Sequence, residues 1–530
     1  MKARRVVLFI ALLSVVLAVG SFAPAPVGLR PAAAATSIRF VDITASDNVV
    51  LKANVVEPSA TGPRPAIVFI NSWGLNDAEY LAQAHTLAAK GYLVLSFTTR
   101  GFWGSGGTID VAGPKDIADV SSVIDWLLAN TDADPDRIGV SGVSYGAGIS
   151  LIASGHDPRI KAVAAMSAWT DLVESMYGNA TRRGQAVGLL KGAADLTGRP
   201  SPELRLALDR YFDNRDVAEV MAWARPRGAA SHLAGINQNQ PAIMIANAYG
   251  DSLFGPNQLV DFYGRLTGPK RLELAPGDHA VVEGTGLIGL PNAVWTNVHR
   301  WFDHYLTGAN TGIDGEQPIQ LDPRGAASPE GYAAWSGVGA RTQRYGLGAM
   351  RWYDGTGSLA AGAGTGWDRK IYSAVDTVAG GGIAILTNGW EALTGIPPTA
   401  WLPAVNRLNA GVWVSDPLPA TGHVRGIASM RLTYTPTADD GMIVAYLYDV
   451  DSLGTGRLIT HAPHTGGEAG IEGTVDLRFP ATAYDVPAGH RLAVIIDTED
   501  LLYLDTNRFG NSVTFGSPAA NPSWLQVPLR

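Results

Sequence analysis

A Gly-x-Ser-x-Gly pentapeptide at residues 142–146 carries the strongest chemical signal in the sequence. It follows a largely apolar run at 137–141 and overlaps the start of a small-residue helical pattern at 145–154. Between a strand and a helix this motif forms a sharp turn that lifts the serine hydroxyl above the sheet edge, and a side chain at either glycine would clash. The context therefore predicts that Ser144 is a nucleophile for acyl transfer.

A serine nucleophile needs a general base and an acid that holds the base in one tautomer. In this strand–turn–helix context the chain order is Ser, then Asp or Glu, then His. Asp251 follows the apolar run 242–246, and His279 follows the run 271–274 after a short loop. We therefore predict Asp251 as the acid and His279 as the base. Asp278 is a competing acid, but its position beside His279 makes the required hydrogen bond awkward.

The alternative interpretation of the pentapeptide is a tight turn in an α/β domain without catalytic activity. The order of Ser144, Asp251 and His279 along the chain favours the enzymatic interpretation.

The oxygen that becomes negatively charged during acyl transfer needs two hydrogen-bond donors. We predict the backbone N–H of Tyr145 and that of Trp73, which lies in the loop 71–74 after the apolar run 65–70. A second loop, 100–107, is rich in glycine but lacks lysine and the Gly-x-Gly-x-x-Gly spacing, so we interpret it as a structural turn and not as a phosphate site.

The remaining histidines give weaker signals. His461 and His464 form a His-x-x-His pair in an apparent Pro/Gly-rich loop with no obvious third ligand, so we expect no metal site there. We also expect no cofactor. The chain has no cysteine, which excludes disulfides, thiolate ligands and a cysteine nucleophile. The histidines assigned to packing or the surface are His85, His299, His304 and His490.

Alternating strands and helices over residues 36–310 must position these side chains. Several of the runs are continuously apolar, which is typical of strands buried on both faces of a parallel sheet. The alternation predicts an α/β domain with right-handed crossovers. The predicted strands are 38–43, 49–56, 65–70, 92–98, 138–140, 162–166, 242–246 and 271–274, and the predicted helices are 77–90, 118–129, 145–154 and 256–266.

The stretch 171–240 interrupts the alternation between two strands of the predicted sheet. It shows no strand pattern and contains helical segments such as 202–212 and 217–224. We predict a helical cap inserted over the active-site edge. The alternative is a pair of long crossover helices without a role in binding.

The pattern changes again near residue 311. Residues 311–530 contain short alternating runs separated by turn residues, which predicts an all-β sandwich or jelly roll without internal repeats. The clearest predicted strands are 383–386, 426–434, 442–448, 473–479 and 491–497.

Length and charge narrow the class of protein. A chain of 530 residues exceeds one ordinary core, so we expect at least two domains. The net charge of −8 and the lack of a long basic run argue against nucleic acid as a partner. The sequence does not predict an oligomeric state.

Residues 1–35 have the pattern of a secretory signal peptide. Lys2, Arg4 and Arg5 precede an apolar run at 6–19, which is too short for a confident membrane span, and an Ala-x-Ala cleavage site precedes Thr36. We therefore expect a secreted protein with no stable membrane span after cleavage. The Arg4-Arg5 pair leaves twin-arginine export open, and an uncleaved anchor is the alternative.

Several passages match one family in combination; they are 142–145, 99–101 with 104–107, 250–254, 301–308 and 487–492. Together they resemble the X-Pro dipeptidyl-peptidase and cocaine-esterase family of α/β-hydrolases over most of residues 40–510. The resemblance implies a hydrolase domain, a helical cap and a C-terminal jelly roll, with Ser144, Asp251 and His279 as nucleophile, acid and base. Esterases of this family often place a tyrosine hydroxyl in the oxyanion hole, whereas the loop 71–74 has none.

We expect a serine hydrolase that cleaves a carboxylic ester or amide through an acyl-enzyme, with an acyl esterase favoured. An X-Pro dipeptidyl-peptidase also needs a carboxylate for the substrate ammonium, and Asp171 and Glu174 are the candidates. The expected partner is a small ester or short peptide. An inactive protein that binds cell wall or carbohydrate is the contrasting class. Candidate pocket residues are Trp73, Phe102, Trp103, Trp169, Tyr177 and Phe254.

Overall fold

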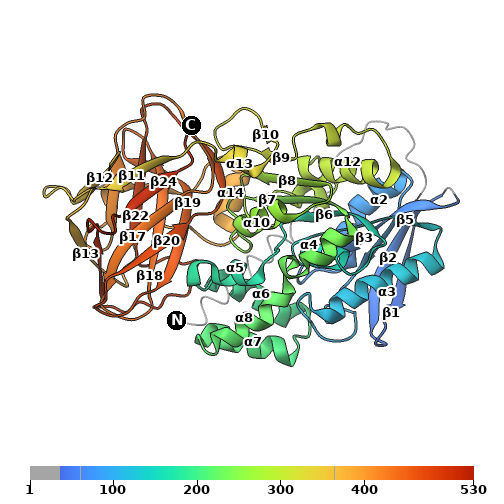
Figure 1. Ribbon diagram of the computed structural model, residues 1–530. Helices are drawn as coiled ribbons and strands as arrows, with labels where there is room; N and C mark the ends of the chain where they lie inside the picture. The colour runs from blue at the N-terminus through green and yellow to red at the C-terminus, as the bar shows by residue number, and fades with distance from the viewer. Residues whose placement is uncertain (1–35, 60, 363) are drawn as a thin grey trace.

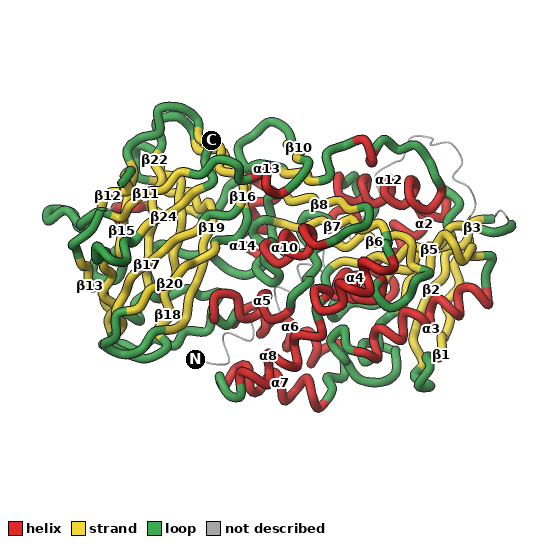
Figure 2. The backbone as a smooth tube through the Cα atoms, viewed as in Figure 1, coloured by secondary structure: helices red, strands yellow, loops and turns green. Residues whose placement is uncertain are grey.

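The computed structural model of the protein describes residues 36–59, 61–362 and 364–530 (Figure 1). The predicted signal peptide, 1–35, lies outside the described residues. Within them, no helix has both the length and the apolar character needed to cross a membrane. An α/β part and a β-rich part lie side by side, as Figure 2 shows by the separation of red helices from the mainly yellow strands.

The α/β part is built on a sheet of ten strands in the order β1-β2-β4-β3-β5-β6-β7-β8-β9-β10. The strands from β4 to β9 are parallel to their neighbours, while β1, β2 and β10 pair antiparallel at the two edges. The bounds are β1 Thr36–Thr44, β2 Val50–Pro58, β3 Arg64–Ile70, β4 Leu93–Phe97, β5 Ala133–Val143, β6 Ile160–Met166, β7 Ala242–Ala248, β8 Lys270–Ala275, β9 Ile319–Leu321 and β10 Glu330–Tyr332.

All eight strands predicted before residue 310 are present. The central strands are apolar runs buried on both faces of the sheet, whereas the edge strand β1 is largely exposed. The sheet does not end at residue 310, since β9 and β10 extend it as far as Tyr332. The strand predicted at 138–140 is also longer than expected, as β5 reaches from Ala133 to Val143.

Helices cover both faces of this sheet. α2 (Leu81–Ala89) and α12 (Ala293–Thr307) pack on one face, and α3 (Pro114–Asn130), α4 (Tyr145–Ser154) and α10 (Asn257–Arg265) pack on the other. The connections also include the short helices η2 Asp77–Tyr80, α11 Gly284–Leu287 and η6 Ile313–Gly315.

The segment between β6 and β7 is helical, as the sequence predicts, and contains no strand. In Figure 1, α5, α6, α7 and α8 lie together below the sheet. The last helix of the segment returns to the hydrolase core, where Ile236 packs closely on Gly155 at the end of α4. The bounds are α5 Leu172–Tyr177, η3 Gly178–Ala180, α6 Gly184–Thr197, α7 Pro202–Asp213, α8 Val217–Ala224, η4 Arg225–Arg227, η5 Ala229–His232 and α9 Leu233–Asn239.

The β-rich part contains a sheet in the order β13-β23-β17-β24-β11-β12-β15-β22-β18-β19-β14, with β20 beside β17, and a separate pair, β16 and β21. All of its pairs are antiparallel except β12 with β15. The bounds are β11 Gln343–Leu347, β12 Thr356–Ala360, β13 Asp368–Tyr372, β14 Thr399–Trp401, β15 Gly411–Ser415, β16 Gly422–Gly426, β17 Ser429–Pro436, β18 Gly441–Val450, β19 Thr455–Gly466, β20 Gly473–Arg478, β21 Thr482–Val486, β22 Arg491–Asp497, β23 Ser512–Gly516 and β24 Trp524–Val527.

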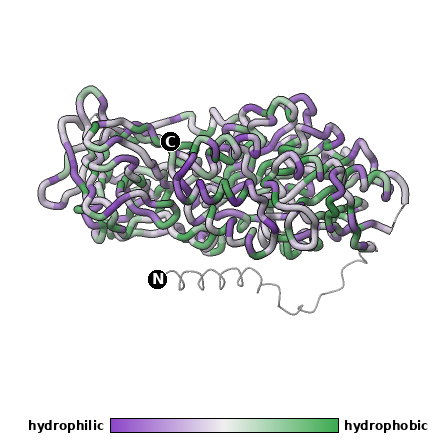
Figure 3. The backbone as a smooth tube through the Cα atoms, turned by 90° about the horizontal axis from the view of Figure 1, so that it is seen from below, coloured by the Kyte–Doolittle hydropathy of each residue, from purple (hydrophilic) through white to green (hydrophobic). Residues whose placement is uncertain are grey.

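Strand β18 is buried on both faces and separates two apolar cores. Ile443 and Leu447 belong to the core inside the β-rich part, whereas Met442 and Tyr446 belong to a second core that also receives Leu189 from the cap helix α6. Leu189 therefore links the α/β part to an apolar core of the β-rich part. Hydrophobic segments, green in Figure 3, occur throughout both parts. The predicted α/β-hydrolase domain followed by a β domain is confirmed.

Two predictions in the β-rich part are wrong. The run 383–386 is not a strand, because α14 (Leu386–Thr394) begins at its last residue and Ile385 has a φ of +67°, which is incompatible with a strand. His461 and His464 lie on strand β19 and not in a loop. Two further short helices are α13 Trp335–Val338 and η7 Leu402–Ala404.

Candidate active site

Ser144 lies in the sharp turn between β5 and α4, with a φ of +57° and a ψ of −112°. A Cβ atom at Gly146 would lie 1.9 Å from the carbonyl oxygen of Ile70, and one at Gly142 would lie 2.7 Å from the same oxygen. Glycine is therefore required on both sides of Ser144, because the turn presses against the end of β3. The positive φ of Ser144 is rare for a residue with a side chain and is typical of strained functional turns.

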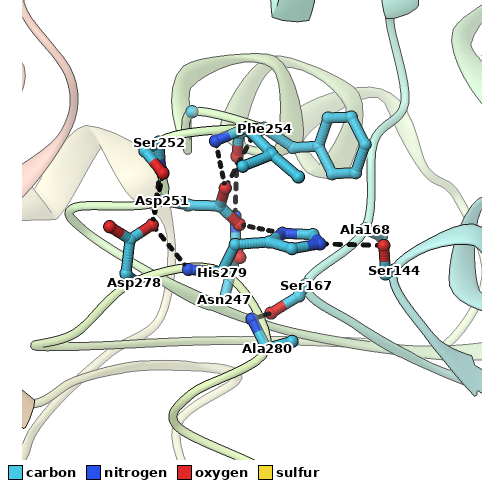
Figure 4. Close-up of polar contacts among 12 residues, drawn as sticks. Ser144, Ser167, Ala168, Asn247, Asp251, Ser252, Phe254, Asp278, His279 and Ala280 are labelled. Atoms are coloured by element: carbon cyan, nitrogen blue, oxygen red, sulfur yellow. Dashed lines mark hydrogen bonds and ion pairs between the residues drawn. The ribbon is translucent and has the colours of Figure 1, made fainter. Parts of the chain in front are cut away.

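Ser144, His279 and Asp251 form a continuous series of polar contacts (Figure 4). The Oγ of Ser144 lies 2.8 Å from the Nε2 of His279, and the Nδ1 of His279 lies 3.0 Å from the Oδ2 of Asp251. All three side chains are buried. These distances meet the geometric requirements of a Ser-His-Asp triad.

Backbone groups hold the carboxylate of Asp251 in place. Its Oδ1 accepts the N–H groups of Leu253 and Phe254, at 2.9 and 2.6 Å, so that Oδ2 is left facing the imidazole. Asp278 is close by but bonds differently. Its Oδ1 accepts the N–H of His279 and both the N–H and the hydroxyl of Ser252, at 2.7 to 2.8 Å.

The electrostatics of the imidazole result from opposing influences. Burial favours the neutral ring, but the negative charge and hydrogen bond of Asp251, together with Glu283 and Asp278, outweigh it and raise the pKa of His279 above its usual value. Burial, reinforced by the charge of Asp251, raises the pKa of Asp278 to about 6. The site therefore favours a positive charge on His279, which is the charge a general base acquires.

The predicted oxyanion donors are the backbone N–H groups of Tyr145 and Trp73. Tyr145 is the first residue of α4, so its N–H has no partner within the helix. Trp73 lies in the loop after β3. In the same loop, the Oγ of Ser72 lies 3.0 Å from the carbonyl oxygen of Val143, the residue before the nucleophile. The loop also packs against Tyr145, since the rings of Trp73 and Tyr145 meet edge to face at 5.0 Å.

A buried carboxyl that the sequence analysis missed, Glu79, braces this loop. Its Oε2 accepts the N–H of Ser72 at 2.7 Å, and its Oε1 lies 2.5 Å from Ser72 Oγ. Burial raises the pKa of Glu79 to about 7. The protonated form satisfies every group here, because Glu79 then donates to Ser72 Oγ, which donates in turn to Val143 O.

Other supports were also missed. The hydroxyl of Tyr145 donates to Asp116 at 2.6 Å and accepts the N–H of Ala112, so this side chain anchors the start of α4. These partners lie far from the motif in sequence. An Asp on a helix such as α3 carries no sequence signal that distinguishes it from a solvated residue, and only the structure shows that Asp116 is buried.

A cavity of about 100 Å³ opens beside Ser144 and runs under the cap helices. Its walls come from α5 to α8 and from the hydrolase loops. Lys191 is the one charged side chain among the residues that line it, and Lys191 is paired with Asp195 at 2.6 Å. The lining aromatic residues are Trp73, Tyr145, Trp169, Tyr177, Tyr211, Trp223 and Phe254.

Four of the predicted substrate-binding residues lie outside this lining. Phe102 is fully buried behind Trp73, and Trp103 donates its Nε1–H to Gly74 O at 2.9 Å. Asp171 caps the N-terminus of α5, where its side chain accepts the N–H of Glu174. Glu174 instead lines a separate small cavity, together with arginine side chains.

The histidine pair does not form a metal site. Residues three apart on a strand point to opposite faces, and His461 and His464 bond instead to the hydroxyls of Tyr503 and Tyr434 at 2.9 and 3.2 Å. Over the described ranges of the chain, no group of three or more His, Asp or Glu side chains could hold a metal ion.

The rate of hydrolysis is expected to depend on the protonation of His279. Because its pKa is raised, kcat/KM with a neutral ester should increase with pH through a limb whose midpoint lies above about pH 6.5. Below that midpoint His279 is protonated and cannot accept the serine proton. The limb should persist in Glu79→Gln, which removes another group that titrates near pH 7. A profile that is flat between about pH 5 and 8 would contradict the role of His279.

Two family models match the chain. The model of the X-Pro dipeptidyl-peptidase (S15) family matches residues 47–281, and that of the X-Pro dipeptidyl-peptidase C-terminal non-catalytic domain matches residues 311–522.

Relatives and solved structures are more distant. The chain is 27% identical over 135 residues to the acyltransferase drtE of Aspergillus calidoustus. The match covers 24% of this chain and 42% of that protein, so this chain spans less than half the length of that curated relative. A CocE/NonD family hydrolase from Staphylococcus aureus superposes with a TM-score of 0.70 at 11% identity and covers 93% of this chain and 94% of its own. An α-amino acid ester hydrolase superposes with a TM-score of 0.68 at 16% sequence identity. This match covers 96% of this chain and 98% of that chain.

These identities show a shared fold, and the two family models together account for most of both parts of the molecule. The chain therefore belongs to the X-Pro dipeptidyl-peptidase (S15) family, which the two models match over residues 47–281 and 311–522.

Proposed function

We propose that this hydrolase is a serine carboxylesterase that accepts esters with an apolar acyl group. The observation that carries the proposal is the cavity beside Ser144, whose lining is apolar apart from the ion-paired Lys191. An apolar acyl chain gains about 0.8 kcal/mol for each methylene group it buries in such a cavity.

The chemistry assigned to the site follows from its geometry. His279 takes the proton of Ser144 as the oxygen attacks the ester carbonyl, and Asp251 stabilises the resulting imidazolium. The N–H groups of Tyr145 and Trp73 stabilise the oxyanion. The protonated His279 then donates to the departing alcohol, and a water molecule, deprotonated by His279, hydrolyses the acyl-enzyme.

The absence of a carboxylate from the pocket lining disfavours a dipeptidyl-peptidase. A substrate ammonium held beside Ser144 would be buried without a negative partner, which is costly. Of the two predicted candidates, Asp171 caps the N-terminus of α5 and Glu174 lines a separate cavity.

A series of p-nitrophenyl esters of increasing acyl length tests the proposal. We expect kcat/KM to increase by up to about fourfold per methylene until the cavity is filled, because about 0.8 kcal/mol corresponds to that factor. Ala207→Leu, which adds bulk to the lining, should reduce the gain for long chains and spare the acetate. Leu206→Ala on the exposed side of α7 is the matched control.

Efficient cleavage of Gly-Pro-p-nitroanilide together with weak cleavage of every ester would overturn the assignment. A kcat/KM that is independent of acyl length would also count against the cavity as the acyl site.

A further inference from the structure

Two groups of the C-terminal domain reach the loops that carry Asp251 and His279. The N–H of Ile385 donates to the Oγ of Ser252 at 3.0 Å. The Nδ2 of Asn388 donates to the carbonyl oxygen of Gly250 at 2.9 Å and lies 3.4 Å from Asp278 Oδ2. Both donors stand at the start of α14, which belongs to the matched C-terminal non-catalytic domain.

The residues they contact are bonded to each other. Ser252, next to Asp251, donates through its N–H and its hydroxyl to Asp278 Oδ1, which also accepts the N–H of His279. Through these bonds the fully buried Asp278 joins the loop of Asp251 to the loop of His279 (Figure 4). The position of Asp251 relative to His279 thus depends on Asp278 and Ser252.

The contact with α14 is close and specific. A Cβ atom at Gly250 would lie 2.7 Å from Asn388 Cγ, so only glycine allows this approach. The left-handed φ of Ile385, which β-branched residues rarely adopt, turns the chain so that its N–H points to Ser252.

We infer that Asn388 and the Ile385 amide are positioning groups that hold Asp251 and His279 in register through Ser252 and Asp278. The inference rests on the proposed roles of Asp251 and His279. The C-terminal domain thereby takes part in setting the geometry of catalysis, although none of its residues touches the substrate.

Asn388→Leu removes the side-chain donor at similar volume, and Asn409→Leu is its matched control. Both asparagines are buried, and Asn409 donates to Tyr372 O at 2.9 Å entirely within the C-terminal domain. We expect both variants to lower Tm by similar amounts. Only Asn388→Leu should lower kcat, by about ten- to hundredfold, with KM changed less than about twofold, because the loss concerns the transition state.

The pH profile gives a second readout. The ionised Asp278 supports the imidazolium of His279, next to Asp251 and Glu283. Without the Asn388 donor, Asp278 holds its proton to higher pH, so the limb of kcat/KM should move to lower pH. In the background of Asp278→Asn, the same Asn388→Leu change should shift the limb little further, and its remaining effect on kcat should reflect the lost bond to Gly250 O.

The rate at which a fluorophosphonate labels Ser144 separates this inference from the proposed substrate class. Labelling requires an activated serine but no acyl pocket. Normal labelling of the wild type without ester turnover would overturn only the esterase assignment. Equal kcat values and equal labelling rates for Asn388→Leu and Asn409→Leu would overturn the positioning role. Should Asn388→Leu fail to fold, Ser252→Ala breaks the same link, and an unchanged labelling rate in it would refute the inference.

Discussion

Ser144→Ala is expected to abolish ester hydrolysis, with a loss of at least about 10³-fold and up to about 10⁶-fold in kcat. The Oγ that this change removes is the atom 2.8 Å from His279 Nε2, and no other hydroxyl takes its place in the series of contacts. Alanine keeps the Cβ that the turn already accommodates, so Tm should hardly change. Steady-state kinetics and thermal unfolding of the same preparation test both statements.

The matched control for this variant is Ser150→Ala on the same helix. Ser150 is buried and donates only to the carbonyl oxygen of Gly146, so its loss should leave kcat within a few-fold of wild type. Residual activity of Ser144→Ala within about tenfold of wild type would refute its role as nucleophile.

Asp251→Asn is expected to reduce kcat by about 10³- to 10⁴-fold. The amide of an asparagine at this position has two orientations. In one, its NH₂ faces the N–H groups of Leu253 and Phe254, so that donors face donors and no hydrogen bond forms. In the other, its NH₂ donates to His279 Nδ1 and stabilises the wrong imidazole tautomer. Either outcome removes the stabilisation of the imidazolium.

Asp278→Asn, measured in parallel, should cost considerably less than Asp251→Asn. Asp278 bonds to the backbone of His279 and not to its ring, so the tautomer is preserved. If Asp278→Asn were the more damaging change and Asp251→Asn nearly harmless, the acid would be misassigned.

The strands and turns that carry the candidate site could be predicted from the sequence because each has a strong local signal. Buried parallel strands appear as uninterrupted apolar runs, and the turn at Ser144 requires two glycines at fixed spacing. Asp251 and His279 could be selected because each follows the carboxyl end of such a strand. The hydrolase fold with its β domain follows from the same patterns.

The supports of the site could not be predicted because they depend on contacts between distant segments. Asn388 lies more than a hundred residues from Asp278, and nothing in its local sequence distinguishes it from other asparagines on helices. The apolar run around Ile385 predicts a strand, but Ile383 and Leu386 are exposed and the left-handed turn at Ile385 leads into α14. Asp171 and Glu174 are candidates on their charge alone, but Asp171 caps α5 and Glu174 lines a different cavity.

The two ends of the acid that the proposed esterase would release lie in different surroundings. The acyl chain lies in the cavity, where Lys191 is the one charged side chain of the lining and is paired with Asp195. The carboxylate lies beside Ser144, where His279 and the N–H groups proposed for the oxyanion can bind it. Inhibition by the acid product should therefore be strongest where the product is ionised and His279 still carries its proton, and it should weaken as the pH rises and His279 becomes neutral.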